Sequence, residues 1–158
     1  MARTTNYDGR RVSLSIYSDS FDYYSTDEQS APTTLNGESG GFVCSGIAKL
    51  CQSVLVFILS DDLVFDGTWG SAFPRYMNGS VQYFGSNLES VAEAAFAEAI
   101  TKLRENERTD APDDERIQTI ELVSWGYQES GTGITMTIQV VSIAGDTRDV
   151  VVPLNLTV

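Results

Sequence analysis

Apolar and polar side chains alternate in the stretch Ile134-Thr135-Met136-Thr137-Ile138-Gln139-Val140. Successive side chains of a β-strand point to opposite faces of a sheet, so this alternation predicts a half-buried strand. A second alternating run follows at residues 150–156, and residues 117–125 predict a strand before it. Because turn-forming residues separate the three runs, the simplest topology is an antiparallel meander.

Two segments before these strands have the period of amphipathic helices. In residues 42–60, and again in residues 86–103, apolar side chains recur every three or four positions. Ser86, followed three positions later by Glu89, predicts a capping box at the start of the second helix. We therefore expect an α+β fold, with two main helices packed on a small antiparallel C-terminal sheet and an extended N-terminal segment.

The chain is predicted to divide into an N-terminal part, residues 1–41, and a domain at residues 42–158. Within the first part, residues 11–17 alternate apolar and polar side chains and predict a half-buried strand. Residues 18–41 are rich in Ser, Asp, Thr, Gly and Tyr, which indicates a long irregular connection. Two interpretations stay open for it: an arm that becomes ordered on a partner, or a disordered leader.

The cysteines, Cys44 and Cys51, lie seven positions apart in the first predicted helix. A rise of about 1.5 Å per residue would place them about 10 Å apart on one helix face, beyond the reach of a disulfide. We expect both to be small core residues. The chain has no histidine, and a metal site would need more ligands than two thiols, so we expect no metal and no cofactor.

The charge of the chain restricts its partners. Asp and Glu number 22 against 10 Lys and Arg, which gives a net charge of −12. This charge repels phosphate backbones and anionic lipids, so we expect neither a nucleic-acid nor a membrane partner. A basic protein surface stays possible, as does a charge that only keeps the chain soluble. The first residues lack the apolar region of a secretory signal, and we expect assembly in the cytosol.

The residues indicate no catalytic site, and we expect that the chain is not an enzyme. A histidine-based triad is excluded, and both cysteines are expected to be buried. Two carboxylates can hydrolyse a glycoside when they lie about 5–10 Å apart, but nothing in the sequence fixes such a separation. The acids considered for this role are Asp61, Asp62, Asp66 and Glu89. The first three could also suggest a calcium loop, but they lack the alternating acids of an EF-hand. The surrounding residues 61–85 instead indicate a structured loop with several aromatic side chains.

In their order and spacing, residues 43–156 resemble the sheath-initiator family of contractile-phage baseplates, small wedge proteins once labelled lysozyme-like. Three passages carry the resemblance: the first helix, an aromatic and glycine-rich loop, and the C-terminal sheet with the turn before it. They are Ser45-Gly46-Ile47-Ala48-Lys49-Leu50-Cys51-Gln52 with Phe57-Ile58-Leu59-Ser60, then Phe65-Asp66-Gly67-Thr68-Trp69-Gly70-Ser71, then Asp114-Glu115-Arg116-Ile117 followed by Ile120-Glu121-Leu122, Met136-Thr137-Ile138-Gln139-Val140 and Val150-Val151-Val152-Pro153-Leu154.

The resemblance implies a structural protein of the virion, located in the tail baseplate and assembled in the host cytoplasm. In that family, strands donated by the first sheath ring add to the initiator's sheet. The implied partners are the tail sheath protein and baseplate wedge proteins, with tail tube or hub proteins in addition. The strand implied to face the sheath consists of Thr147, Arg148, Asp149, Val150, Val151, Val152, Pro153, Leu154, Asn155 and Leu156. Pro153 cannot donate a ladder hydrogen bond, so we expect this strand to lie at a sheet edge or to expose that side.

Many members of the family carry a Glu-Pro-Arg sequence between the second helix and the first strand of the meander, thought to grip the wedge. Here Asp114, Glu115 and Arg116 occupy that place, and the proline is displaced to Pro112. The resemblance implies that these three residues dock on the wedge, and the alternative is a solvated charged turn. Two other functions stay open: another tail or neck connector protein, or a glycan-hydrolysing domain, as the old label of the family suggests.

Overall fold

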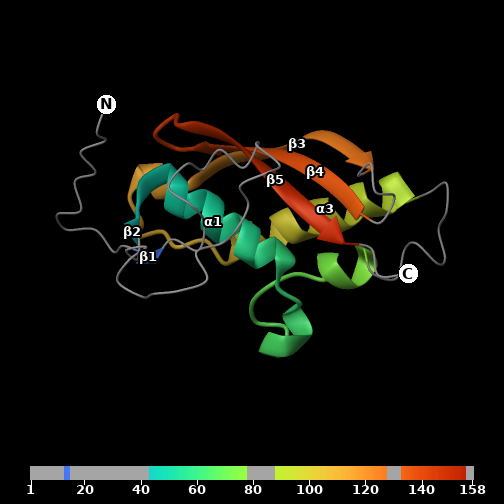
Figure 1. The fold of residues 1–158 in the computed structure, drawn as a ribbon. Coiled ribbons are helices and arrows are strands. Elements are labelled where there is room, and N and C mark those ends of the chain that lie inside the picture. The colour runs from blue at the N-terminus through green and yellow to red at the C-terminus, as the bar shows by residue number, and fades with distance from the viewer. Residues whose placement is uncertain (1–12, 15–42, 78–87, 128–132, 156–158) are drawn as a thin grey trace, which may run out of the picture.

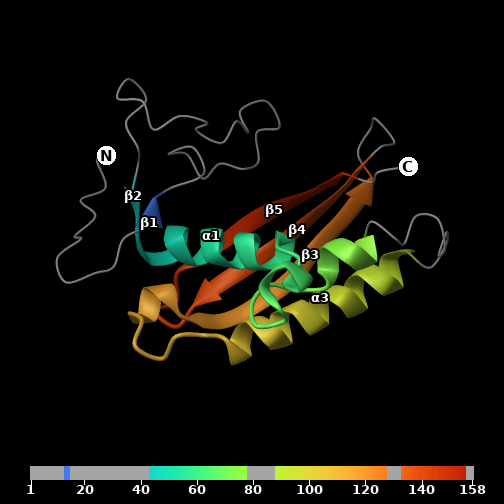
Figure 2. The same cartoon turned by 90° about the horizontal axis from the view of Figure 1, so that it is seen from below.

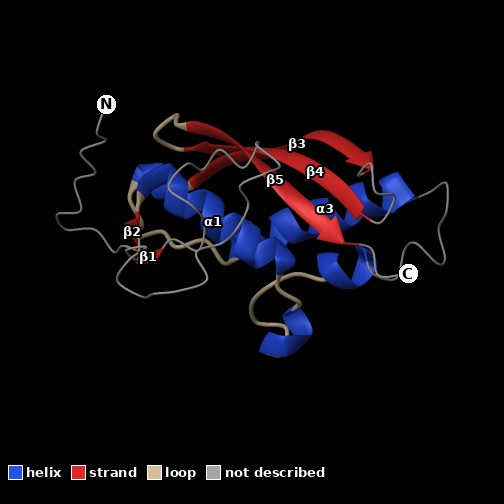
Figure 3. Cartoon of the chain, in the orientation of Figure 1, coloured by secondary structure: helices blue, strands red, loops and turns tan. Residues whose placement is uncertain are grey.

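The computed structural model describes residues 13–14, 43–77, 88–127 and 133–155 (Figure 1). Two main helices, α1 (Gly46–Leu59) and α3 (Leu88–Glu105), lie against one face of an antiparallel sheet (Figures 2 and 3). The sheet consists of β3 (Ile117–Tyr127), β4 (Gly133–Ser142) and β5 (Thr147–Asn155), in the order β3-β4-β5. The predicted α+β fold and the predicted antiparallel meander are both confirmed.

The core lies between the two helices and the sheet. Met136, Ile138 and Val140 of β4 alternate along the strand and are fully buried, as are Val54 and Ile58 of α1. Alternation on the strand and helical spacing on α1 therefore direct their apolar side chains into the same layer. Each such side chain stabilises the fold by about 1.5–3 kcal/mol when it is fully buried. This layer holds α1 and α3 on the sheet.

The first helix begins later than the periodicity predicted. Residues Val43–Cys44 form a short strand, β2, which pairs antiparallel with β1 (Ser13–Leu14). At Gly46 the backbone has a φ of 63°, a left-handed conformation that glycine adopts without strain, and α1 begins there. The strand predicted at residues 11–17 is confirmed only in its two described residues.

The predicted placement of the two cysteines on one helix face is wrong. Cys44 lies in β2, before the helix begins, whereas Cys51 lies within α1. Cys51 is fully buried in the core, as predicted, and burial raises the pKa of its thiol to about 12. A thiol with this pKa stays protonated at neutral pH and is a poor nucleophile.

The second predicted helix corresponds to α3. Glu89 lies in its first turn, where a negative charge interacts favourably with the helix N-terminus. Ser86, the predicted partner of Glu89 in a capping box, lies outside the described residues. Between α1 and α3, the 3-10 helix η1 (Asp62–Phe65) and a short helical segment at residues 73–77 confirm the predicted structured loop for residues 61–77, and its remaining residues lie outside the described part of the chain.

Candidate protein-docking surfaces

The strand β5 forms one edge of the three-stranded sheet, because its described residues pair only with β4. The predicted edge position of this strand is confirmed. Along the strand, Val150 and Val152 are buried, Arg148 and Val151 are half-buried, and Thr147 and Asp149 are exposed. Pro153, Leu154 and Asn155 complete β5, whereas Leu156 lies outside the described residues.

The turn between β4 and β5 determines which amides of β5 point away from β4. Ser142 N–H donates to Asp146 O at 2.8 Å, and Gly145, with a φ of 87°, completes a three-residue turn. In an antiparallel ladder, hydrogen-bonded pairs alternate with non-hydrogen-bonded pairs, and the register to β4 continues without a shift. Even-numbered residues of β5 therefore bond to β4, and the backbone groups of residues 147, 149, 151, 153 and 155 point outward. Pro153 therefore removes no hydrogen bond between β5 and β4. Because it has no N–H group, the outer edge has one donor fewer.

The opposite edge of the sheet is partly occupied at the start of β3. Ile117 N–H donates to the Glu107 carboxylate, and Gln118 O accepts a hydrogen bond of 3.1 Å from the Arg104 guanidinium. Within the described residues, no comparable side chain bonds to the outer backbone of β5. In the part of the chain that the structure describes, the outer backbone of β5 therefore has fewer side-chain partners than the start of β3.

Glu115, one of the three predicted wedge-docking residues, faces the interior. It lies in the 3-10 helix η3 (Asp113–Glu115), and its side chain is only 5% exposed. The carboxylate accepts a hydrogen bond of 3.1 Å from Gly46 N–H and pairs with Lys49 Nζ at 2.5 Å. It thereby supplies the acceptor and the negative charge that the N-terminus of α1 favours. The alternative of a solvated charged turn is wrong for Glu115.

The other two predicted docking residues lie in the same turn. Arg116 pairs with the exposed Asp113 at 3.5 Å, and Asp114 is half-buried. The backbone oxygens of Arg116 and Asp113 accept hydrogen bonds from Ile143 N–H at 3.0 Å and Ala144 N–H at 3.1 Å. The turn therefore joins the tip of the β4–β5 hairpin to the start of β3. Docking of this turn on a wedge protein stays a prediction.

The segment at residues 60–71 forms a loop whose two ends lie side by side. Ser71 N–H donates to Ser60 O at 2.8 Å, and Asp62 N–H donates to Ser71 O at 3.1 Å. Gly70 has a φ of 88°, and a Cβ atom there would lie 2.6 Å from Ser60 O. Only glycine fits this position without moving backbone, so the closure of the loop depends on it.

Ion pairs brace the same loop. Arg75 pairs with Asp61 and also with Asp62, at 2.6 Å, while Lys102 of α3 pairs with Asp62 at 2.8 Å. Hydrogen bonds from Lys102 and Arg75 hold the pKa of Asp62 below its usual value. Asp62 therefore stays ionised, whereas a general acid of a glycosidase requires a raised pKa. Glu89, another acid considered for this role, is exposed on α3.

The tip of the loop presents three consecutive apolar side chains, Leu63, Val64 and Phe65, which we name the apolar knob. Their exposed fractions are 68%, 75% and 43%, and the loop projects beyond the two main helices (Figure 1). The Trp69 ring contacts Phe65 and also Phe57 of α1 edge to face, with centroid distances of 5.1 and 5.4 Å. Sequence reasoning identified a structured aromatic loop but missed this exposed run.

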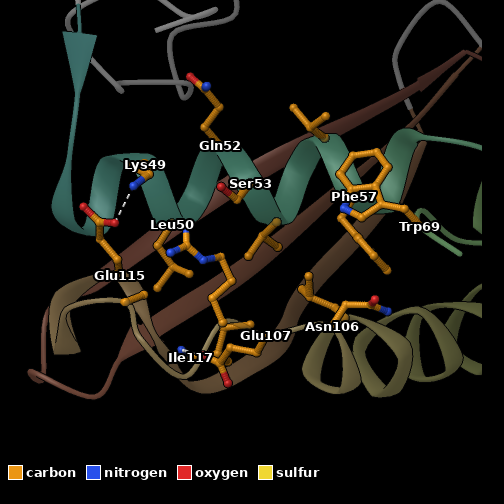
Figure 4. A pocket seen from close by; sticks show the side chains of 15 residues that line it. Lys49, Leu50, Gln52, Ser53, Phe57, Trp69, Asn106, Glu107, Glu115 and Ile117 are labelled. Carbon is orange, nitrogen blue, oxygen red and sulfur yellow. Dashed lines mark hydrogen bonds and ion pairs between the residues drawn. The ribbon is translucent and has the colours of Figure 1, made fainter. Parts of the chain in front are cut away.

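A cleft of about 340 Å³ lies between α1 and the segment that follows α3 (Figure 4). Leu50 and Phe57 line its apolar part, and the Lys49–Glu115 pair lies at one end. Arg108, on the other side, makes hydrogen bonds of 2.6–3.0 Å to the Asp110 carboxylate. Lys49, Glu115 and Arg108 of the cleft lining thus already have ion-pair partners within the chain.

Within the described residues, no group of three His, Cys, Asp or Glu side chains is placed to hold a metal ion. No helix in the described part of the chain has the length and apolar character needed to cross a membrane. No family model, curated protein or solved structure matches the chain.

Proposed function

We propose that this chain is a structural baseplate protein of a contractile phage tail, which nucleates the sheath by accepting strands from the first sheath ring. The observation that supports this proposal is the outer edge of β5, where the backbone groups of residues 147, 149, 151 and 155 point away from β4. A strand added along this edge would satisfy those groups by β-augmentation. In this role the chain acts by assembly and needs no catalytic residue.

The position of Pro153 divides the outer edge of β5. Before it, residues 147, 149 and 151 each offer both a donor and an acceptor, whereas Pro153 offers only its carbonyl. We therefore place the main contact of an incoming strand at residues 147–151. Each ladder bond contributes only about 1 kcal/mol, but several copies of the chain around one tail would make such joints act together.

The first test replaces the outward amide of Val151. We expect Val151→Pro to leave the domain folded, because this amide points away from β4 and the strand already contains a proline at the equivalent position 153. Phage carrying Val151→Pro should form baseplates with bare tubes in electron micrographs. The matched control is Val151→Thr, which keeps the amide and the β-branched shape and should give sheathed tails.

Circular dichroism of the purified variants checks that both remain folded. Folded Val151→Pro protein together with normally sheathed tails would contradict strand addition at this edge. Antibody labelling of isolated tails provides an independent check, since the proposal requires the chain at the baseplate end. Its absence from tails would reject the proposal as a whole.

A further inference from the structure

We infer that the apolar knob is a second docking site, which inserts into an apolar pocket with a basic rim on the baseplate protein beneath this chain. The inference rests on the proposed function, since it assigns the surface by which the same protein is held in the baseplate. The turn at residues 114–116 is less suited to this role, because the Glu115 carboxylate already has two internal partners.

The knob exposes three consecutive apolar side chains to solvent. Single exposed apolar residues are normal on a protein surface, but a run of three is unusual unless it has a function. Leu63 and Val64 expose 68% and 75% of their surface, although they are among the more apolar residues of the chain. Transferring them into an apolar pocket would remove this surface from water, which is favourable.

The loop that carries the knob is held in one shape by several bonds. Backbone bonds between Ser60 and Ser71 close its base, and Arg75 and Lys102 hold Asp62. At the tip, Thr68 N–H donates to Phe65 O at 2.9 Å. A surface that is held in one shape loses little conformational entropy on binding, so the knob is preorganised to fit a pocket.

The net negative charge of the chain favours a partner with a basic surface. Two copies of a chain with a net charge of −12 repel each other, and an anionic lipid surface repels it as well. Asp66 follows the knob directly, and its side chain is exposed. A pocket rimmed by Lys or Arg would therefore attract the chain and orient the knob.

The knob is too small to form a stable interface by itself. Three side chains bury far less than the roughly 1,200–2,000 Å² of a stable independent interface. The knob is thus suited to an assembly in which each copy is held at several places, with the β5 edge as another contact. This argues for a baseplate protein as the occupant and against a free dimer of this chain.

The test compares how much of the chain remains in isolated tails, measured by quantitative mass spectrometry. The double variant Leu63→Ser/Val64→Ser should lower the amount per tail about tenfold or more, because central apolar anchors dominate interface affinity. Ile143→Ser is the matched control, since Ile143 is 41% exposed at the distant hairpin tip, and it should leave the amount unchanged. Asp66→Asn keeps the left-handed conformation and removes one charge, and should lower the amount about two- to threefold.

The identity of the occupant is tested by a photo-crosslinker, p-benzoylphenylalanine, in place of Phe65 in assembled tails. Crosslinking to another baseplate protein supports the inference, whereas crosslinking to a second copy or to the sheath subunit overturns it. If wild-type tails contain the chain and tails of the Leu63→Ser/Val64→Ser phage contain the same amount of it, the docking role of the knob is overturned, but the proposed function is not. Absence of the wild-type chain from tails would instead reject the proposed function, so the two failures are distinguishable.

Discussion

The turn at residues 113–116 and the loop at residues 60–71 use their side chains in opposite ways. The turn is charged, yet Glu115 is only 5% exposed and bonds to the start of α1. The loop has an apolar tip, yet Val64 is 75% exposed. Charge in a sequence is usually taken as a sign of exposure and apolar character as a sign of burial. Here the charged turn makes contacts inside the fold, and the apolar tip is exposed.

The largest expected effect comes from Glu115→Ala, which removes the partner of both Gly46 N–H and Lys49. We expect a loss of about 3 kcal/mol in the free energy of unfolding, because the change removes the acceptor of the Gly46 N–H and the carboxylate that pairs with Lys49 in a nearly buried place. Urea unfolding would measure this loss. The matched control is Asp113→Ala, whose ion pair with Arg116 is exposed and should contribute less than about 0.5 kcal/mol.

An equal, small effect of both substitutions would contradict the internal role of Glu115. In that case the carboxylate would be available to a partner, and the predicted docking role of the turn would regain support. Glu115→Gln refines the result, because an amide oxygen can still accept from Gly46 N–H but cannot pair with Lys49 as an ion. We expect its loss to lie between those of Glu115→Ala and Asp113→Ala.

A smaller effect is expected from Gly70→Ala at the closure of the loop. The new Cβ atom would lie 2.6 Å from Ser60 O, and alanine would have to adopt a φ of 88°. We expect a loss of about 2 kcal/mol in the free energy of unfolding, from backbone strain and a displaced loop end. The control is Gly67→Ala, which has a similar φ of 75° but no atom within 4 Å of the new Cβ. Equal losses would mean that φ alone, and not the close approach to Ser60, constrains the loop.

The fold was largely predictable because its elements depend on local periodicity. The alternation in residues 134–140 identified β4, and Pro153 identified the edge position of β5. The start of α1 was not predictable, because Val43 and Cys44 fit a helical stripe as well as a strand. That stripe gave no sign that the turn to the helix occurs at Gly46.

The candidate surfaces were harder to predict, because they depend on contacts between distant parts of the chain. Glu115 meets a helix start 69 positions away, which no local pattern indicates. Similarly, the run Leu63 to Phe65 could have been core, and its exposure follows from the closure of the loop at Ser60 and Ser71. The outward direction of the Val151 amide required the register of the hairpin in addition to the strand assignment.

The smallest effect on stability is expected from substitutions in the apolar knob. The double variant Leu63→Ser/Val64→Ser should change the free energy of unfolding by no more than about 0.5 kcal/mol, because substitutions at exposed positions that leave core and caps intact are close to neutral. Asp61 caps η1 through its bond of 2.9 Å to the Leu63 backbone N–H, and this bond remains in the variant. Thermal and urea unfolding of the purified chain would measure the change. A loss of 2 kcal/mol or more would show that the two side chains stabilise the fold, which would remove the reason to assign them to a partner. A neutral result would instead show that the stability of the fold does not depend on the side chains of Leu63 and Val64.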